Sequence, residues 1–275
     1  MKKSNLTLAA LSLATACLLP TSASAEIYNQ TITAIFGSGN PDVGWTVDAD
    51  NGITLALRSK DRSDGSTTNT SGTYNEQPGY DPIQFAKVPP VLRAKWNWEF
   101  SINSGTSTLD TYDYYLGVDT DLSVGVSQTI INALTFHHDN AYGTSATANG
   151  GGTKGTSAVF ASTNTVAQNS RNITFAPWSQ DPTKNATYDY ELYAVEKGAG
   201  PLGDKLASTS IQVIVGTGGQ TVQQLINALA IGVKSHGQYM KAINDLLKYL
   251  EEGGVINKDQ RKELHNVAAQ SSVGK

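Results

Sequence analysis

The sequence predicts a mainly β protein, an antiparallel β-sandwich or jelly-roll-like domain followed by a C-terminal α-helical appendage. Apolar and polar residues alternate with a period of two in several short runs between residues 26 and 215. Gly, Ser, Thr and Asn separate these runs, as in sandwiches whose short strands are joined by turns. Beyond residue 221 glycine becomes rare, and apolar residues recur at helical spacing.

The first 25 residues have the features of a bacterial secretory signal peptide. Lys2 and Lys3 precede a mostly apolar run, and Ala23-Ser24-Ala25 is a small-x-small cleavage site. The only cysteine, Cys17, lies inside this segment, and the leucine before it stands one position too early for lipoprotein processing. We therefore expect cleavage after Ala25 and a secreted mature chain without cysteine, in the periplasm, on the cell surface or in the medium.

The composition argues against two classes of partner. Removing Lys2 and Lys3 from the 20 basic residues leaves 18 against 24 acidic residues, a net charge near −6. Because no basic stripe is present, nucleic acids and anionic membranes are not expected as partners. No later segment of the sequence is long and apolar enough for a transmembrane helix.

The clearest expected strand covers residues 94–103, where Trp96, Trp98 and Phe100 share one face and polar residues share the other. Residues 112–118 form the next strand after a short turn, and we expect the two strands to pair as a hairpin. The other expected strands cover residues 30–36, 53–58, 124–131, 172–175, 188–195 and 208–215.

The two tryptophans of this strand would form either a buried core or an exposed platform for sugar rings. The opposite face of the strand is polar and consists of Lys95, Asn97, Glu99 and Ser101. An antiparallel sheet usually has one dry face and one wet face. We therefore expect Trp96 and Trp98 in the core and the polar face in solvent.

Residues 216–220 form a glycine-rich hinge by composition, and residues 221–275 are expected to be helical. Two apolar stripes predict the first two helices, and they consist of Val222, Leu225, Ile226, Leu229 and Val233 and of Tyr239, Ile243, Leu246, Leu247 and Leu250. Gly253 and Gly254 are expected to end the second helix, and Asn257 to begin a third, with Gln260 completing a capping box. Such amphipathic helices must bury their apolar faces on each other, on the sandwich or on another molecule.

A cluster of carboxylates is the main candidate for a metal site, and it consists of Asp110, Asp113, Asp119 and Asp121. Asp119 and Asp121 form a D-x-D pair at the end of an expected strand, and calcium prefers several carboxylate and carbonyl oxygens. The same pattern is common in turns, and the spacing of an EF-hand is missing. A calcium site and a set of turn residues are both open interpretations, and no other cofactor is expected.

Other motifs offer little chemistry. His137, His138 and Asp139 are adjacent, and neighbours on a strand point to opposite faces, so a polar strand end is the favoured interpretation. The sequence contains no G-x-S-x-G elbow and no phosphate-binding loop. If the protein were a glycan hydrolase, Glu99 would be the candidate catalytic acid, but no positional signature indicates the second carboxylate that hydrolysis requires.

Four stretches resemble a group of uncharacterised exported bacterial proteins that often end in a PEP-CTERM-type sorting tail. They are residues 36–48, 96–105, 112–121 and 187–195, so the resemblance covers most of residues 26–215. It implies a secreted β-sandwich. The chain departs from the group because it has no terminal apolar helix followed by a basic cluster. Instead, the segment from Ser235 onward resembles small helical appendages of other exported bacterial proteins, which favours release or another mode of attachment over surface sorting.

Three classes of function follow, in decreasing order of expectation. The first is a secreted, non-catalytic extracellular or cell-surface module that binds a polysaccharide or protein, or that self-associates by adding residues 26–36 to a neighbour's sheet edge. The second is a calcium-dependent carbohydrate-binding protein, which needs an exposed row of Trp or Tyr beside the aspartates. The third is a glycan hydrolase built around Glu99. Because sandwiches host all three classes, the site has to decide between them.

Overall fold

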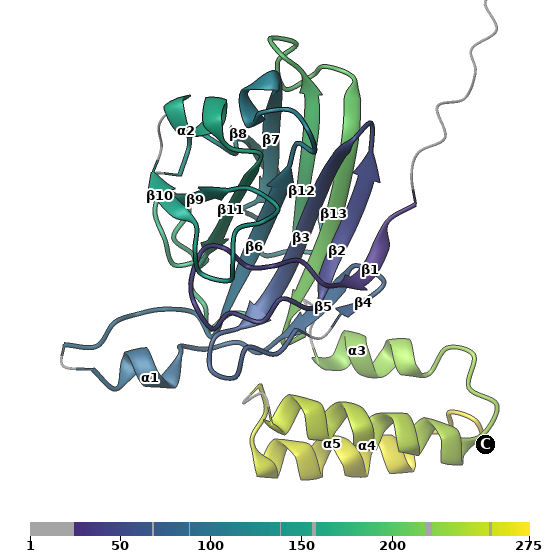
Figure 1. The fold of residues 1–275 in the computed structure, drawn as a ribbon. Coiled ribbons are helices and arrows are strands. Elements are labelled where there is room, and N and C mark those ends of the chain that lie inside the picture. Colours follow the sequence, from purple (N-terminus) through teal and green to yellow (C-terminus); the bar gives the residue numbers. More distant parts are fainter. Residues whose placement is uncertain are drawn as a thin grey trace, which may run out of the picture.

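The computed structural model describes residues 25–67, 69–87, 89–137, 139–155, 158–217, 222–252 and 255–275. Residues 26–217 contain a sandwich of two β-sheets, and helices follow it at the C-terminal end (Figure 1). The predicted mainly β class with a helical appendage is therefore confirmed. The expected signal peptide up to residue 24, most of the expected hinge, and Gly253 and Gly254 lie outside the described residues.

The first sheet, sheet A, has the strand order β1-β2-β3-β6-β11-β9-β10, and all its pairs are antiparallel. Asn51 and Gly52 join β2 and β3 in a tight turn in which both residues have positive φ, 51° and 77°, as a type I′ hairpin requires. The strands are β1 (Ile27–Gln30), β2 (Trp45–Asp50), β3 (Ile53–Asp61), β6 (Trp96–Asn103), β9 (Asn140–Gly143), β10 (Thr153–Gly155) and β11 (Val166–Arg171).

The second sheet, sheet B, has the strand order β4-β5-β13-β12-β7-β8. Its pairs are antiparallel except for β5 and β13, which run parallel, so the expectation of an antiparallel sandwich holds with one exception. The strands are β4 (Asn69–Thr70), β5 (Thr73–Glu76), β7 (Tyr112–Asp119), β8 (Gln128–Asn132), β12 (Ala186–Glu196) and β13 (Lys205–Val215). Short helical turns connect some strands: α1 (Pro82–Phe85), η1 (Leu109–Thr111) and α2 (Ala158–Thr163).

The main core fills the space between the two sheets. Trp96 and Trp98 of β6 are 0% and 3% exposed, which confirms that they lie inside. They meet tyrosines of sheet B: the rings of Trp98 and Tyr190 stack with centroids 4.9 Å apart, and those of Trp96 and Tyr188 lie 5.7 Å apart. Aromatic pairs of this kind add to the free energy of burial, so the aromatic contacts between β6 and β12 stabilise the sandwich.

The expected hairpin of β6 and β7 is wrong, because the two strands belong to different sheets. β6 pairs with β3 and β11, whereas β7 pairs with β12 and β8. The connection between them includes the turn η1, which carries the chain across the end of the core. Both strands have an apolar face, and each face packs on the same core from opposite sides.

Sheet A is covered on its second face as well, and the expectation of a solvated polar face is therefore wrong. Residues 31–43, here called the strap, cross that face, and Ala34, Ile35 and Phe36 form a second apolar cluster on it with side chains of sheet A. The polar face of β6, which was expected in solvent, is buried: Asn97 is 6% exposed, Glu99 0% and Ser101 3%. Of the strand expected at residues 30–36, only Gln30 lies in a strand, at the end of β1. In the strap, the backbone N–H groups of Ile32 and Ala34 bond to Asp42 of the same segment, and that of Ile35 bonds to the side chain of Gln168 of β11 instead of to a strand backbone.

Two other expected strands differ from the structure. The strand expected at residues 124–131 begins only at Gln128, after a loop. No strand covers residues 172–175. Asn172 instead uses its side-chain amide to clamp the start of β6: Nδ2 donates to the carbonyl oxygens of Ala94 and Trp96, at 3.1 and 2.9 Å.

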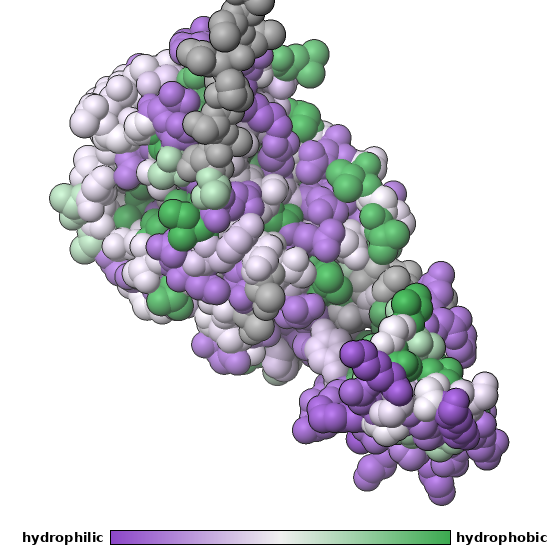
Figure 2. Space-filling model, turned by 90° about the vertical axis from the view of Figure 1, so that its right-hand side faces the viewer, coloured by the Kyte–Doolittle hydropathy of each residue, from purple (hydrophilic) through white to green (hydrophobic). Residues whose placement is uncertain are grey.

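The C-terminal segment forms three helices with a core of their own: α3 (Val222–Leu229), α4 (His236–Glu252) and α5 (Lys258–Gln270). The predicted capping box at the start of α5 is present, because Asn257 and Gln260 each bond the other's backbone N–H at 2.9 Å. Figure 2 shows this segment as a lobe projecting from the sandwich, with a mostly hydrophilic surface on the side in view. Over the ranges described, no helix has the length and apolarity needed to cross a membrane.

Candidate functional site

A cavity of about 370 Å³ lies at the side of the sandwich where β7 and β8 meet α2 and η1. This volume is at the lower end of the range for small-ligand sites, roughly 300–1,000 Å³. Residues from five parts of the chain line it: Asp110, Tyr112, Asp113, Tyr114, Asn132, Leu134, Thr135, Tyr142, Ala158, Val159, Ala161, Ser162 and Lys197.

The floor of the cavity is apolar and fixed by packing. Tyr114, Leu134 and Tyr142 are at most 8% exposed. The ring of Tyr142 stacks on Phe160 of α2 with centroids 5.3 Å apart, and its hydroxyl donates to the carbonyl oxygen of Leu134 at 3.1 Å. These contacts hold α2 against the sandwich and fix the position of the Tyr142 side chain.

The rim of the cavity carries two carboxylates in different surroundings. Asp113 pairs with the Nζ of Lys197 at 2.7 Å and accepts a hydrogen bond from the backbone N–H of Gly198 at 2.8 Å. Partial burial acts to raise the pKa of Asp113, but the bonds from Lys197 and Gly198 outweigh it and hold that pKa below its ordinary value. Asp110 is exposed, and it accepts a hydrogen bond from the hydroxyl of Thr108 at 2.6 Å. One carboxylate is thus neutralised by its partner and the other is available.

Tyr114 places a polar atom at the apolar floor. Its side chain is 0% exposed, and the side chain of Ser104 interacts with its hydroxyl. Burial, assisted by the neighbouring Tyr112, raises the pKa of Tyr114 well above its ordinary value, so the hydroxyl keeps its proton.

The four aspartates of the predicted calcium cluster do not come together. Asp110 of η1 and Asp113 at the start of β7 line the cavity, whereas Asp119 is the last residue of β7 and Asp121 lies beyond it. At about 3.3 Å per residue, the two ends are separated by about 20 Å. A single ion therefore cannot be held by all four, and among the residues with described positions no group of three or more acidic, His or Cys side chains could hold a metal.

Asp119 acts as a turn acceptor. Its Oδ1 accepts from the backbone N–H groups of Asp121 and Ser127, at 3.0 and 3.1 Å, and its Oδ2 accepts from that of Asp189 at 3.3 Å. Asp121 in turn accepts from the N–H of Ser123 at 2.6 Å, which lowers the pKa of Asp121. These bonds fix the loop between β7 and β8, and they match the turn interpretation of the D-x-D pair.

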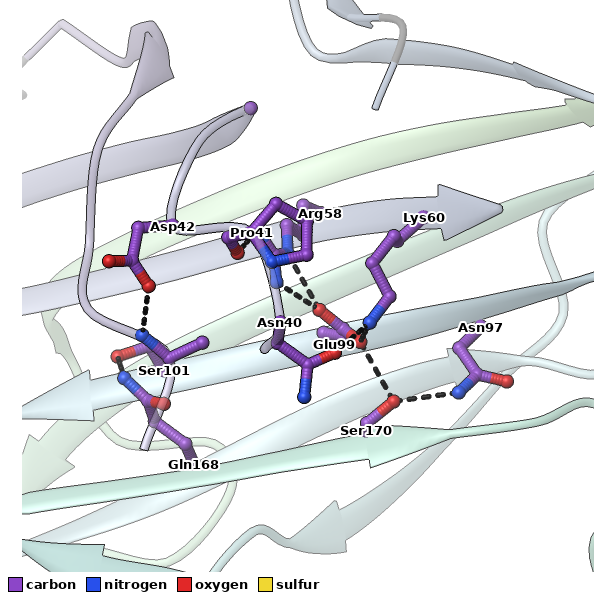
Figure 3. A network of polar contacts seen from close by, with 12 residues as sticks. Asn40, Pro41, Asp42, Arg58, Lys60, Asn97, Glu99, Ser101, Gln168 and Ser170 are labelled. Atoms are coloured by element: carbon purple, nitrogen blue, oxygen red, sulfur yellow. Dashed lines mark hydrogen bonds and ion pairs between the residues drawn. The ribbon is translucent and has the colours of Figure 1, made fainter. Parts of the chain in front are cut away.

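Glu99, the candidate hydrolase acid, lies in a buried ionic network away from the cavity (Figure 3). Its Oε2 pairs with Arg58 of β3 at 2.6 Å, and its Oε1 pairs with Lys60 at 3.0 Å and accepts from the hydroxyl of Ser170 at 2.8 Å. The side chains of Arg58 and Glu99 are both 0% exposed. No substrate can reach this carboxylate without removing the strap.

The same network attaches the strap to sheet A. The Nη1 of Arg58 donates to the carbonyl oxygens of Pro41 and Val43, each at 2.7 Å, and Lys60 donates to Asn40 (Figure 3). The guanidinium also lies 4.1 Å from the centre of the Trp45 ring. Charge-assisted bonds to backbone carbonyls explain why a polar face is buried here, and they assign Glu99 a structural role.

The aromatic residues do not form an exposed row. Trp45, Trp96 and Trp98 are at most 3% exposed, and Trp178 is half-buried and stacks on Phe136 with centroids 5.0 Å apart. His137 is 1% exposed and lies among the rings of Trp98, Phe100 and Phe136, whereas His138 is outside the described residues. Tyr112, at the cavity rim, is the aromatic residue that accompanies Asp110 and Asp113.

Comparison with known proteins gives no assignment. No protein-family model matches the chain, and no curated protein matches its sequence. The spacing of acidic residues in the sequence identified Asp110 and Asp113 but not Lys197. No local pattern connects Lys197 with Asp113, because the two residues are 84 positions apart. The sequence also did not single out Tyr112, because only the tertiary structure shows that Tyr112 lies at the cavity rim whereas Tyr114 is buried.

Proposed function

We propose that this chain is a secreted, non-catalytic extracellular binding module and that the cavity beside β7 is its ligand site. The observation that carries the proposal is the combination of an apolar aromatic floor with a small number of polar groups on one rim. Small-ligand sites in proteins have this composition, with a few polar groups fixing the orientation of the ligand. The signal-peptide features of the first 25 residues support secretion.

A neutral sugar is the ligand class that fits this cavity best. The half-buried ring of Tyr112 offers an apolar surface for the C–H face of a sugar. The Asp110 carboxylate and the side chains of Asn132 and Thr135 line the same cavity and can exchange hydrogen bonds with sugar hydroxyls. An extracellular polysaccharide is therefore the proposed partner, and calcium is not required for these contacts.

The surroundings of the candidate acids favour binding over hydrolysis. A glycoside hydrolase needs one carboxylic acid with a raised pKa that can protonate the leaving group. Lys197 has the opposite effect on Asp113, whose pKa is lowered, and Asp110 is exposed to solvent. Glu99 is buried beneath the strap. These three observations support a module that binds a glycan without cleaving it.

The proposal is tested with residues 26–275 on an array of neutral oligosaccharides, followed by calorimetric titration of the sugars that bind. Replacing Tyr112 with alanine should weaken binding by about tenfold or more, because it removes the stacking surface. The matched control is Tyr115→Ala, since Tyr115 is half-buried on the same strand but lies outside the cavity and contacts Tyr193. Equal loss in both variants, or sugar binding that Tyr112→Ala leaves unchanged, would reject this site.

A further inference from the structure

The edge strand β8 of sheet B is unprotected. β8 ends the sheet and pairs on one side with β7 in regular register. Within the described ranges, its backbone makes no other backbone hydrogen bond, apart from the carbonyl oxygen of Asn132, which accepts from Phe136. The remaining N–H and C=O groups of this edge are free to pair with a further strand.

The sequence around β8 lacks the usual protection of an edge. No Asp, Glu, Lys, Arg or Pro occurs between Asp121 and Asp139. Several apolar side chains in and before the strand are exposed instead: Leu122 at 37%, Val124 at 64%, Val126 at 62% and Ile130 at 41%. Natural proteins normally place charges or prolines at such an edge to prevent pairing between molecules.

The other three edges of the two sheets differ from β8. β4 has two residues, and β10 has three with the exposed Lys154 at its centre. β1 has four residues, an irregular register with β2, and Asn29 at a positive φ of 57°. Short length, charge and irregular backbone each discourage strand addition, so β8 is the edge that remains open to it.

We propose that β8 is the contact of a homodimer in which two copies pair their β8 strands antiparallel about a two-fold axis. Pairing a strand with itself in this way is an isologous contact. With the two-fold axis at Ile130, the middle residue of β8, Ile130 faces its own equivalent and Thr129 faces Ile131 of the other copy. Like charges directly opposite one another would oppose such a pair, and this strand has none. The whole chain carries a formal net charge of −4, so an uncharged edge is where two copies can approach.

The dimer would join the two copies of sheet B into one continuous sheet. Asn132 is the last residue of β8 and also lines the candidate cavity. Pairing through β8 would therefore place two cavities close to the dimer interface, and two sites on one particle bind a repeating polysaccharide with higher avidity than one. The dimer itself does not depend on the nature of the ligand, so its test is independent of the test of sugar binding.

Sedimentation equilibrium of residues 26–275 tests the proposal. The wild type should show a concentration-dependent monomer–dimer equilibrium. Ile130→Lys should raise the dimer dissociation constant by about tenfold or more, because it places like charges at the centre of the pair. The control is Leu202→Lys, since Leu202 is 97% exposed in the loop between β12 and β13, away from the edge. A strict monomer at all concentrations, or a dimer unaffected by Ile130→Lys, would overturn the proposal.

A cross-linking variant keeps the test independent of any loss of folding. Cys17 is the only cysteine of the chain, so residues 26–275 contain none, and Ile130→Cys introduces a single thiol. Ile130 is the middle residue of β8, and facing side chains of paired strands lie close enough for a disulfide. Mild oxidation should give a disulfide-linked dimer with Ile130→Cys and far less with Leu202→Cys. Equal cross-linking of the two variants would show that the contact is not specific to β8.

Discussion

At the scale of single residues, two buried glutamates of sheets A and B show how surroundings decide charge. Glu99 is balanced by Arg58 and Lys60 and serves as an anchor for the strap. Glu76, at the end of β5, is 6% exposed, and no cation of the described residues pairs with it; its Oε1 accepts from the hydroxyl of Ser59 at 2.6 Å. Burial raises the pKa of Glu76 to about 8, and that bond only partly offsets the effect.

Glu76 makes stability depend on pH. The pKa of Glu76 is about 8 in the folded chain, against an ordinary value of 4.5, so its favourable contribution to the free energy of unfolding is complete below pH 4.5 and is lost as the pH rises through about 8. Glu76→Gln removes the titration and should raise the unfolding temperature at pH 8 to 9 but not near pH 4. The difference above both pKa values is of the order of 5 kcal/mol. Thermal unfolding from pH 4 to 9 checks this, with Glu252→Gln on the exposed end of α4 as control. Identical pH profiles for Glu76→Gln and wild type would contradict the assignment.

The Glu99 network predicts a large effect on stability. Glu99→Gln leaves Arg58 and Lys60 without their counter-charge beneath the strap, and removing one partner of a buried pair costs about 3–5 kcal/mol. Urea unfolding followed by circular dichroism measures the loss. In the matched control, Asp245→Asn breaks the exposed pair of Lys241 and Asp245 and should change stability by less than about 0.5 kcal/mol. A change of similar size in both variants would argue against a structural role for Glu99.

At the scale of elements, local patterns were predicted well and long-range pairings were not. The alternation of residues 94–103 identified β6, and helical spacing with a capping box identified α4 and α5, because these signals lie within one element. The predicted pairing of β6 and β7 was wrong because both strands have apolar faces of the same kind, and the sequence alone does not say which sheet a strand joins. The burial of the polar face of β6 beneath the strap was missed for a related reason. A polar face is buried only when residues far away in the sequence form hydrogen bonds or ion pairs with it.

The capping box allows the helical segment to be tested apart from the sandwich. Asn257→Ala removes the acceptor for the backbone N–H of Gln260 and should destabilise α5 by about 1 kcal/mol. Hydrogen exchange of backbone amides should show faster exchange in α5 and unchanged protection in β12 and β13. Asn227→Ala is the control, because Asn227 lies near the end of α3 and does not cap α5. Faster exchange throughout the sandwich would mean that the two parts do not unfold separately.

At the scale of the whole molecule, the chain buries both faces of sheet A and leaves one side of the sandwich open beside β7 and β8. The candidate cavity and the unprotected edge both lie there. Half of the predicted acidic cluster, Asp110 and Asp113, lies in that region, and the other half organises a turn at the far end of β7. The sequence gives the residue types of a site but not which of them the fold brings together.

The central claim is that this cavity binds a neutral sugar without chemical change. The most direct measurement is a calorimetric titration of residues 26–275 with the best-binding oligosaccharide, followed by chromatography of the sugar after long incubation. We predict one binding site per chain, loss of that binding in Tyr112→Ala, and a sugar recovered intact. Shortened sugar products that scale with protein concentration, or full binding by Tyr112→Ala, would contradict the claim.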